Sequence, residues 1–213
     1  MLFRSETKIR AQAGAQLSKI ASCALEQSLE GFEFAAGIPG TLGGAVVMNA
    51  GAYGGELKDV LVEATVLDTE GNVRTLKNEE LELGYRHSIV KEKNYIVLEA
   101  VIELKKGSAD SIKAVMDDLK EKRVSKQPLD RPSAGSTFKR PEGHFAGKLI
   151  QDAGLRGFTV GGAQVSEKHC GFVINRDHAT SADILSLCRQ VQEKVKEQFG
   201  VELELEVKLL GEF

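Results

Sequence analysis

The sequence of 213 residues lacks the features that mark several large classes of protein. It has no apolar run close to the roughly 20 residues of a membrane-spanning helix, and its first residues lack the apolar core of a signal peptide. Its formal net charge of −3 provides no basic excess of the kind that nucleic-acid-binding domains carry. We therefore expect a cytoplasmic protein that works neither in a membrane nor on nucleic acid.

Cysteine and histidine are too few and too scattered to indicate a disulfide framework or a metal site. The three cysteines (Cys23, Cys170 and Cys188) form no C-x-x-C pair, which favours reduced thiols over disulfides. The four histidines have no metal-ligand spacing, so we expect no metal site. With 42% hydrophobic and 28% charged residues, the composition is typical of a folded protein with one large domain or two small ones.

The periodicity of apolar residues predicts an α+β unit in the first half of the chain. Apolar residues recur at helical spacing over residues 17–29, and Gly31 stands where a glycine stop is typical. Strands are predicted over residues 63–68, 72–76 and 95–104. We expect this unit to end at residue 107.

A second unit, residues 108–213, is predicted from two strong helices and a terminal strand. The first helix covers residues 110–126, and Thr180 or Ser181 is expected to cap the second, which Gly200 closes. Between the helices, residues 127–144 hold three of the four prolines and show no periodicity, which is typical of a loop. Residues 201–209 alternate strictly between apolar and polar side chains, which predicts a half-buried strand.

Residues 37–57 contain seven glycines and no charged side chain before Glu56. Neither the phosphate-loop pattern nor the G-x-G-x-x-G fingerprint is present in this stretch. Glycines are compatible with positive φ angles, which let successive N–H groups converge on a ligand, but they also serve tight turns and close packing. From the pattern alone, a packed turn and a cofactor-binding backbone are equally good explanations.

Several ordered segments resemble one enzyme family. GIPGTLGGA (37–45) followed by MNAGAYG (48–54) resembles the flavin-binding signature of UDP-N-acetylenolpyruvoylglucosamine reductases. Residues 161–175 are also similar to the family, with Cys170 where alanine is expected. Further matches follow in the family's order, at GYRHS (84–88), SAGSTFKRP (133–141), AGKLI (146–150) and Glu206-Val207 ahead of Gly211. The resemblance extends from about residue 12 to the end and is closest to the family's shorter subclass.

The resemblance implies an α+β fold: the second half of a PCMH/VAO-type FAD-binding domain in residues 1–107, then a C-terminal substrate-binding domain in residues 108–213. It implies a monomer in the bacterial cytoplasm that binds FAD without a covalent link and uses NADPH as reductant. The expected reaction converts UDP-N-acetylglucosamine enolpyruvate to UDP-N-acetylmuramate, for peptidoglycan synthesis. Family members carry a further FAD-binding loop before the equivalent of residue 12, so we expect this chain alone to hold FAD weakly or not at all.

Three residues match the family's catalytic positions. Ser136 is expected to give a proton to C2 of the substrate, while Arg86 and Glu206 stabilise the enolate. Without the resemblance, Ser136 would be interpreted as a turn serine, Arg86 as a surface arginine, and Glu206 as one of three solvated acids on a strand. Expected cofactor contacts are Ile38, Pro39, Gly40, Thr41, Gly43, Gly44, Asn49, Ala50, Gly51, Ala52, Tyr53 and Ile96. Expected contacts for the UDP diphosphate or the substrate carboxylate are Lys139, Arg140, His144, Lys148 and His169.

Two other functions stay open. A non-catalytic remnant could still recognise a UDP-sugar through the C-terminal half of the chain. Another flavin oxidoreductase of the same fold, such as an alcohol or sugar oxidase, would often attach its flavin through His or Cys, and residues 37–57 contain neither.

Overall fold

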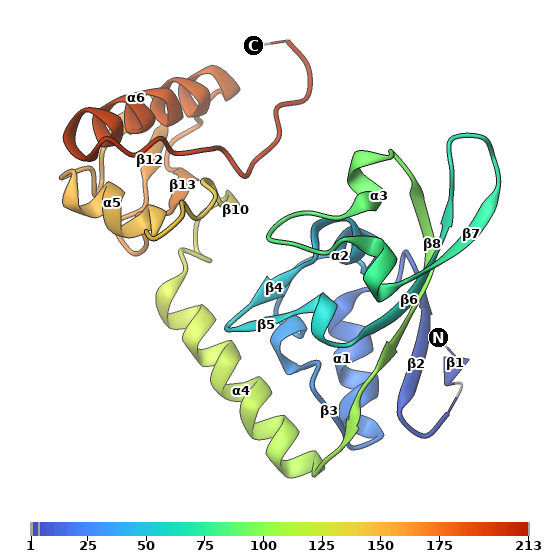
Figure 1. The fold of residues 1–213 in the computed structure, drawn as a ribbon. Helices are drawn as coiled ribbons and strands as arrows, with labels where there is room; N and C mark the ends of the chain where they lie inside the picture. The colour runs from blue at the N-terminus through green and yellow to red at the C-terminus, as the bar shows by residue number, and fades with distance from the viewer. Residues whose placement is uncertain (1, 4, 213) are drawn as a thin grey trace. The chain divides into compact units, whose positions relative to one another are not determined.

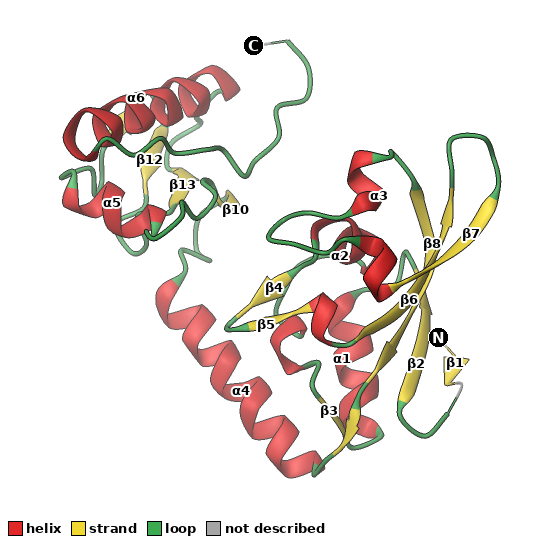
Figure 2. Cartoon of the chain, viewed as in Figure 1, coloured by secondary structure: helices red, strands yellow, loops and turns green. Residues whose placement is uncertain are grey.

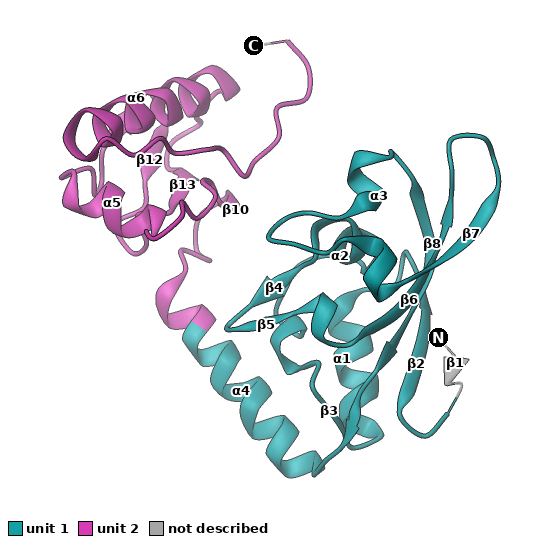
Figure 3. Cartoon of the chain, in the orientation of Figure 1, with its two compact units in different colours: residues 1–122 teal, residues 123–213 magenta. Residues whose placement is uncertain are grey.

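The computed structural model describes residues 2–3 and 5–212, which form two compact units, residues 1–122 and 123–213 (Figure 3). Helices and strands alternate through both units (Figures 1 and 2), so each unit is of mixed α and β structure. Among the helices of the described residues, none is both long enough and apolar enough to cross a membrane.

The first unit is built on a five-stranded antiparallel sheet. Its strands lie in the order β1 (Leu2–Phe3), β2 (Lys8–Gln12), β8 (Ile96–Glu103), β6 (Leu61–Leu67) and β7 (Val73–Lys77). The last three confirm the strands predicted from the sequence. The turn between β6 and β7 is held by the carboxylate of Asp68, which accepts hydrogen bonds from the backbone N–H groups of Glu70 (3.0 Å) and Asn72 (2.8 Å).

Helices α1 (Leu17–Glu26) and α2 (Leu42–Met48) supply the core that packs on this sheet. The fully buried Ile20 and Val46 lie in the same core cluster as Ala100 of β8. The remaining elements are short: β3 (Leu29–Glu30), β4 (Gly51–Ala52), β5 (Gly55–Glu56), β9 (Lys105–Lys106), α3 (Ile89–Glu92), and the 3₁₀ turns η1 (Glu33–Ala35), η2 (Leu57–Asp59) and η3 (Asn78–Leu81).

The prediction that Gly31 ends the first helix is wrong. The helix stops at Glu26, and Ser28 takes a left-handed conformation with φ of 53°. The chain then enters β3, where Leu29 pairs with Lys106 of β9 and is buried in the core. Leu29 fits the helical periodicity by spacing, but it reaches the core from a strand.

Helix α4 (Ala109–Lys126) confirms the helix predicted at 110–126, yet the two units divide within it, between Lys122 and Arg123, rather than at residue 107. Residues 109–122 of α4 belong to the first unit, where Ile112 is buried and Met116 packs against that unit's core. The predicted apolar face is only partly used, since Val115 is exposed.

The second unit contains a four-stranded antiparallel sheet covered by two helices. Its strand order is β10 (Ser133–Ser136), β13 (Phe172–Asn175), β12 (Ala163–Val165) and β11 (Thr159–Val160), and the helices are α5 (Ala146–Asp152) and α6 (Ser181–Phe199). Thr180 caps α6: its hydroxyl accepts from Asp183 N–H, and its own N–H donates to the Asp183 carboxylate. Gly200, with φ of 70°, closes the helix as predicted.

The terminal strand predicted over residues 201–209 does not form as a strand. This segment makes one isolated bridge, between Leu205 and Phe138. Leu203 is buried, which follows the predicted alternation, but Leu209 is exposed. Two backbone hydrogen bonds join this segment to residues 137–139: Glu206 N–H donates to Thr137 O, and Lys139 N–H donates to Glu204 O, both at 2.8 Å.

Candidate functional site

Five of the seven glycines of the stretch 37–57 fall into two groups. Three are required by packing within the protein: a Cβ on Gly43 would lie 2.8 Å from the Cβ of Ala13, one on Gly51 would lie 2.8 Å from Gly55 O, and one on Gly55 would lie 2.7 Å from the Phe34 ring. Backbone hydrogen bonds hold Gly43 in this position, since its N–H donates to Ala13 O at 2.9 Å. At these positions packing within the protein requires glycine, and contact of Gly43 and Gly51 with FAD stays a prediction.

The second group faces open space. A Cβ on Gly40 would meet no atom within 4 Å, and one on Gly44 would meet only the Thr41 hydroxyl at 3.9 Å. Gly40, Thr41 and Gly44 are all exposed at the start of α2. This uncharged edge therefore fits a ligand that must approach the backbone closely, as a flavin cofactor does.

The other expected cofactor contacts differ in exposure. Asn49 is buried, and its side chain is engaged within the protein. Pro39, Tyr53 and Ile96 are exposed, whereas Ile38, Ala50, Gly51 and Ala52 are half-buried. Contact of these residues with FAD stays a prediction.

Two alanine substitutions separate the two groups of glycines. Gly43→Ala is expected to lower the free energy of unfolding by about 1–3 kcal/mol, because its methyl group has no room beside Ala13. Gly44→Ala is expected to raise it by up to about 1 kcal/mol, since alanine is the better helix former, and at the same time to weaken FAD binding. Thermal unfolding of the apoprotein and FAD titration by flavin fluorescence measure the two effects. With an unsubstituted protein that binds FAD as the reference, unchanged FAD affinity in the Gly44 variant would contradict the assignment of this edge to the cofactor.

Arg86 lies at the tip of a tight turn in the first unit. Gly84 and His87 exchange two backbone hydrogen bonds, each of 3.2 Å, and Arg86 between them has a φ of 54°. A left-handed conformation is uncommon for a non-glycine residue and has to be held by the surrounding structure. Immediately after the turn, Ser88 is fully buried and donates its hydroxyl to Val47 O at 2.8 Å. The guanidinium of Arg86 lies 5.1 Å from the centre of the Tyr85 ring.

Ser136 and Glu206 both adjoin Thr137 in the second unit, Ser136 along the chain and Glu206 through a backbone hydrogen bond. Ser136 is exposed at the end of β10, and the next residue, Thr137, is buried. Three hydrogen bonds hold Thr137: its N–H donates to Gly171 O (2.9 Å), its hydroxyl oxygen accepts from Val173 N–H (3.0 Å), and its carbonyl accepts from Glu206 N–H (2.8 Å). Thr137 thus fixes the backbone next to both Ser136 and Glu206. The sequence offers no signal for this role of Thr137, because residues 127–144 show no periodicity.

The three glutamates of the terminal segment differ in exposure. The Glu202 carboxylate pairs with Lys196 at 2.5 Å, which holds the pKa of that carboxyl below its usual range, and Glu204 forms an ion pair with Lys139. Both glutamates are exposed, whereas Glu206 is half-buried. The structure therefore separates Glu206 from two residues that the sequence pattern cannot tell apart from it.

The five expected substrate contacts lie in the second unit. Lys139 pairs with Glu204, and Lys148 pairs with Asp152 one turn along α5. Arg140 lies over the Phe145 ring, 4.0 Å from its centre, and His144 is exposed. Binding of phosphate or carboxylate by these residues stays a prediction.

His169 is unsuited to act as a cation. Burial lowers the pKa of its imidazole, so the ring is neutral near pH 7. Its Nδ1 accepts a hydrogen bond from Gly171 N–H at 3.0 Å, and its ring meets Phe172 edge to face. Only Nε2 can then donate a hydrogen bond to a ligand.

One group of side chains could approach a cation. Glu82, His87 and Glu92 place one ligand atom each within 4.8 Å of one another, with His87 Nε2 at 3.6 Å from Glu92. Both glutamates are exposed, and such groups are common on protein surfaces without an ion. We propose no metal site there.

The chain matches two family models, one in each unit. Residues 3–77 match an FAD-binding domain, and residues 127–210 match the C-terminal domain of UDP-N-acetylenolpyruvoylglucosamine reductase. These two domains in this order define a flavoprotein of the oxidoreductase class, with the α+β fold that the sequence predicts.

Similar proteins identify the particular family. The UDP-N-acetylenolpyruvoylglucosamine reductase of Agathobacter rectalis is 64% identical over 205 residues, which cover 96% of this chain and 65% of the relative. That of Caldanaerobacter subterraneus subsp. tengcongensis is 59% identical over 206 residues, covering 97% and 68%. The crystal structure of UDP-N-acetylenolpyruvylglucosamine reductase from Thermus caldophilus has a TM-score of 0.82 and 36% identity, covering 96% of this chain and 73% of that one.

The chain therefore belongs to the UDP-N-acetylenolpyruvoylglucosamine reductase family, which confirms the predicted resemblance. It spans about two thirds of the length of the curated relatives named above.

Proposed function

We propose that this chain carries the residues that reduce UDP-N-acetylglucosamine enolpyruvate to UDP-N-acetylmuramate with FAD and NADPH. The observation that carries the proposal is the pairing of residues 204–206 with residues 137–139, in the domain that matches the reductase family. It hydrogen-bonds the half-buried Glu206 to Thr137, the residue that follows the exposed Ser136. Bound FAD would accept hydride from NADPH and supply it to C3 of the enolpyruvyl group.

The residues of the chain would stabilise the negative charge that develops on the substrate and supply the proton. Hydride addition at C3 leaves negative charge at C2 that spreads into the carboxylate. The guanidinium of Arg86 is suited to stabilise this charge because it is permanently cationic and presents several fixed donors. Ser136 would give its hydroxyl proton to C2, and Glu206 would assist the stabilisation or relay a proton. The added hydride and proton together give the lactyl ether, which balances the reaction.

The open edge at Gly40 and Gly44 supports FAD as the cofactor of the first unit, and NADPH is proposed from the family resemblance. The absence of His and Cys from residues 37–57 agrees with a non-covalent flavin. The substrates and NADPH are the only partners that we propose, with the protein acting as a monomer.

A turnover assay tests the proposal and separates it from the two alternatives. The chain, supplied with excess FAD, is expected to oxidise NADPH only when UDP-N-acetylglucosamine enolpyruvate is present, and to yield a product heavier by two hydrogen atoms. The same assay is run on a fusion that adds the part of the Agathobacter relative outside the match, because this chain spans only part of that protein. Binding of the UDP-sugar without turnover in both proteins would favour the non-catalytic remnant. Oxygen consumption with an alcohol or a sugar would favour an oxidase.

A further inference from the structure

The turn that carries Arg86 is anchored to the C-terminal end of α2. On one side of the tip, Gly84 O accepts a hydrogen bond of 3.1 Å from Asn49 Nδ2. On the other side, the buried Ser88 hydroxyl donates to Val47 O. Because Arg86 sits in a left-handed conformation between these anchors, its position depends on contacts outside the turn.

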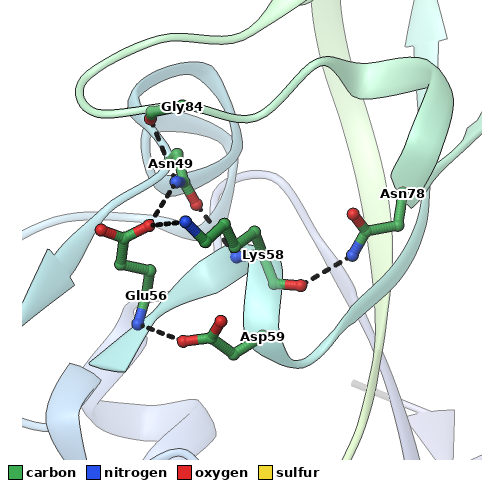
Figure 4. Close-up of polar contacts among 6 residues, drawn as sticks. All are labelled: Asn49, Glu56, Lys58, Asp59, Asn78 and Gly84. Atoms are coloured by element: carbon green, nitrogen blue, oxygen red, sulfur yellow. Dashed lines mark hydrogen bonds and ion pairs between the residues drawn. The ribbon is translucent and has the colours of Figure 1, made fainter. Parts of the chain in front are cut away.

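Asn49 is the centre of this anchoring network (Figure 4). Asn49 is buried, with 1% of its surface exposed. Both the nitrogen and the oxygen of its side-chain amide make hydrogen bonds. Nδ2 donates to Gly84 O and to the carboxylate of Glu56 (3.0 Å), while Oδ1 accepts from Lys58 N–H (2.9 Å). These partners fix the orientation of the amide, because exchanging its oxygen and nitrogen would break all three hydrogen bonds.

Glu56 extends the network toward Arg86. Its carboxylate pairs with Lys58 Nζ at 2.8 Å, and its backbone N–H donates to Asp59 (2.9 Å). The hydrogen bond from Lys58 is the main cause that holds the pKa of Glu56 below its usual range, with smaller contributions from Asn49 and from the charge of Arg86. Glu56 is therefore ionised, and the positive charge of Arg86 contributes to this. The Asn49 amide links the Glu56 carboxylate to the Gly84–His87 turn.

We propose that Asn49 is a positioning residue, which ties the Gly84–His87 turn to α2 and η2 and so fixes Arg86 for catalysis. This inference rests on the proposed function, in which Arg86 stabilises the developing enolate. It also changes the role expected for Asn49, whose side chain would serve the catalytic turn rather than contact FAD directly.

The simpler explanation is that Asn49 only caps α2. It has the left-handed conformation of a helix C-cap, with φ of 42°, and asparagine is common at such positions. Glycine is the residue best suited to a left-handed cap. Asn49→Gly therefore keeps the cap and removes the network, so the two explanations predict different results for this variant.

The experiment compares Asn49→Asp and Asn49→Gly with Asn78→Asp as the matched control. Asn78 Nδ2 also makes two hydrogen bonds to backbone, to Lys58 O (2.7 Å) and Leu61 O (2.6 Å), but none to the Arg86 turn. Both Asn49 variants are expected to lower kcat by about 10- to 100-fold through misplacement of Arg86, with the KM for the UDP-sugar changed less than about twofold. The Asn78 variant is expected to keep kcat. In an Arg86→Ala background, adding Asn49→Asp is expected to cause no further loss.

Hydrogen exchange of the apoprotein provides a readout that does not depend on activity. Both Asn49 variants are expected to exchange faster at residues 84–88, whereas Asn78→Asp is expected to affect residues 58–61. Full kcat in Asn49→Gly, or unchanged exchange at residues 84–88, would overturn the proposal. So would losses that multiply in the Arg86→Ala background. An inactive wild type with faster exchange at residues 84–88 in the variants would instead contradict the proposed function and keep the anchoring role of Asn49.

Discussion

Ser136→Ala is expected to lower kcat by about 10²- to 10⁴-fold while leaving the affinity for the UDP-sugar nearly unchanged. The variant removes the only group that we propose to deliver the proton to C2, but it removes nothing that holds the nucleotide. The fold is expected to tolerate the change, because Ser136 is exposed and the neighbouring Thr137 makes the anchoring hydrogen bonds. Product formation and equilibrium binding of the UDP-sugar measure the two quantities separately.

Ser133→Ala is the matched control for this prediction. Ser133 is an exposed serine of the same strand, and its hydroxyl oxygen lies 3.5 Å from Gly135 N–H. Its loss is expected to change kcat less than about twofold. If Ser136→Ala retained wild-type kcat, a different group would have to donate the proton. If both variants lost activity equally, the effect would reflect the strand rather than the Ser136 hydroxyl.

Arg86→Ala is expected to lower kcat by about 10²- to 10³-fold, the loss typical of removing one preorganised donor to a developing negative charge. The second variant, Arg86→Lys, keeps the charge but loses the planar donor group, so we expect intermediate activity. Both variants place a non-glycine residue at φ of 54°, so the two have the same backbone strain at this position. The ratio of their kcat values reports the contribution of the guanidinium beyond its charge.

A surface arginine of the same unit is the control for Arg86. Arg74 pairs with Asp68 at 2.7 Å in the β6–β7 hairpin, and Arg74→Ala removes one positive charge there. Its kcat is expected to stay within about twofold of wild type. Wild-type kcat in Arg86→Ala would exclude a role in stabilising the transition state, and a change confined to KM would indicate ordinary substrate binding.

The sequence alone predicts the long, periodic elements well. Helix α6 is predicted with Thr180 or Ser181 as its N-cap and Gly200 as its end, and the structure has Thr180 as the N-cap and Gly200 in the left-handed position. Strands β6, β7 and β8 were likewise predicted from their composition and turn residues. Local signals suffice at these places because the native backbone agrees with local preference.

Prediction fails where packing decides between local alternatives. Leu29 continues the spacing of the first helix, yet the core takes it from β3. Alternation predicts a strand at the C-terminus, but within the part of the chain that the structure describes this segment forms an isolated bridge between Leu205 and Phe138. Such choices depend on residues distant in the sequence.

The candidate site shows the same division. Periodicity and composition alone do not select Arg86, Ser136 or Glu206, and the family resemblance singles them out. The structure adds the residues that hold them in place. Asn49 donates a hydrogen bond to the Arg86 turn, and Thr137 follows Ser136 and accepts a hydrogen bond from Glu206 N–H. The glycine-rich stretch likewise combines two explanations, with Gly43, Gly51 and Gly55 required by packing and Gly40 and Gly44 open to a ligand.

The reaction run in deuterium oxide with unlabelled NADPH tests the central claim most directly. With the chain or its fusion and excess FAD, we expect UDP-N-acetylmuramate with deuterium at C2, and Ser136→Ala is expected to slow its formation while Ser133→Ala does not. Absence of this product in both proteins, or its formation at an undiminished rate by Ser136→Ala, would contradict the account.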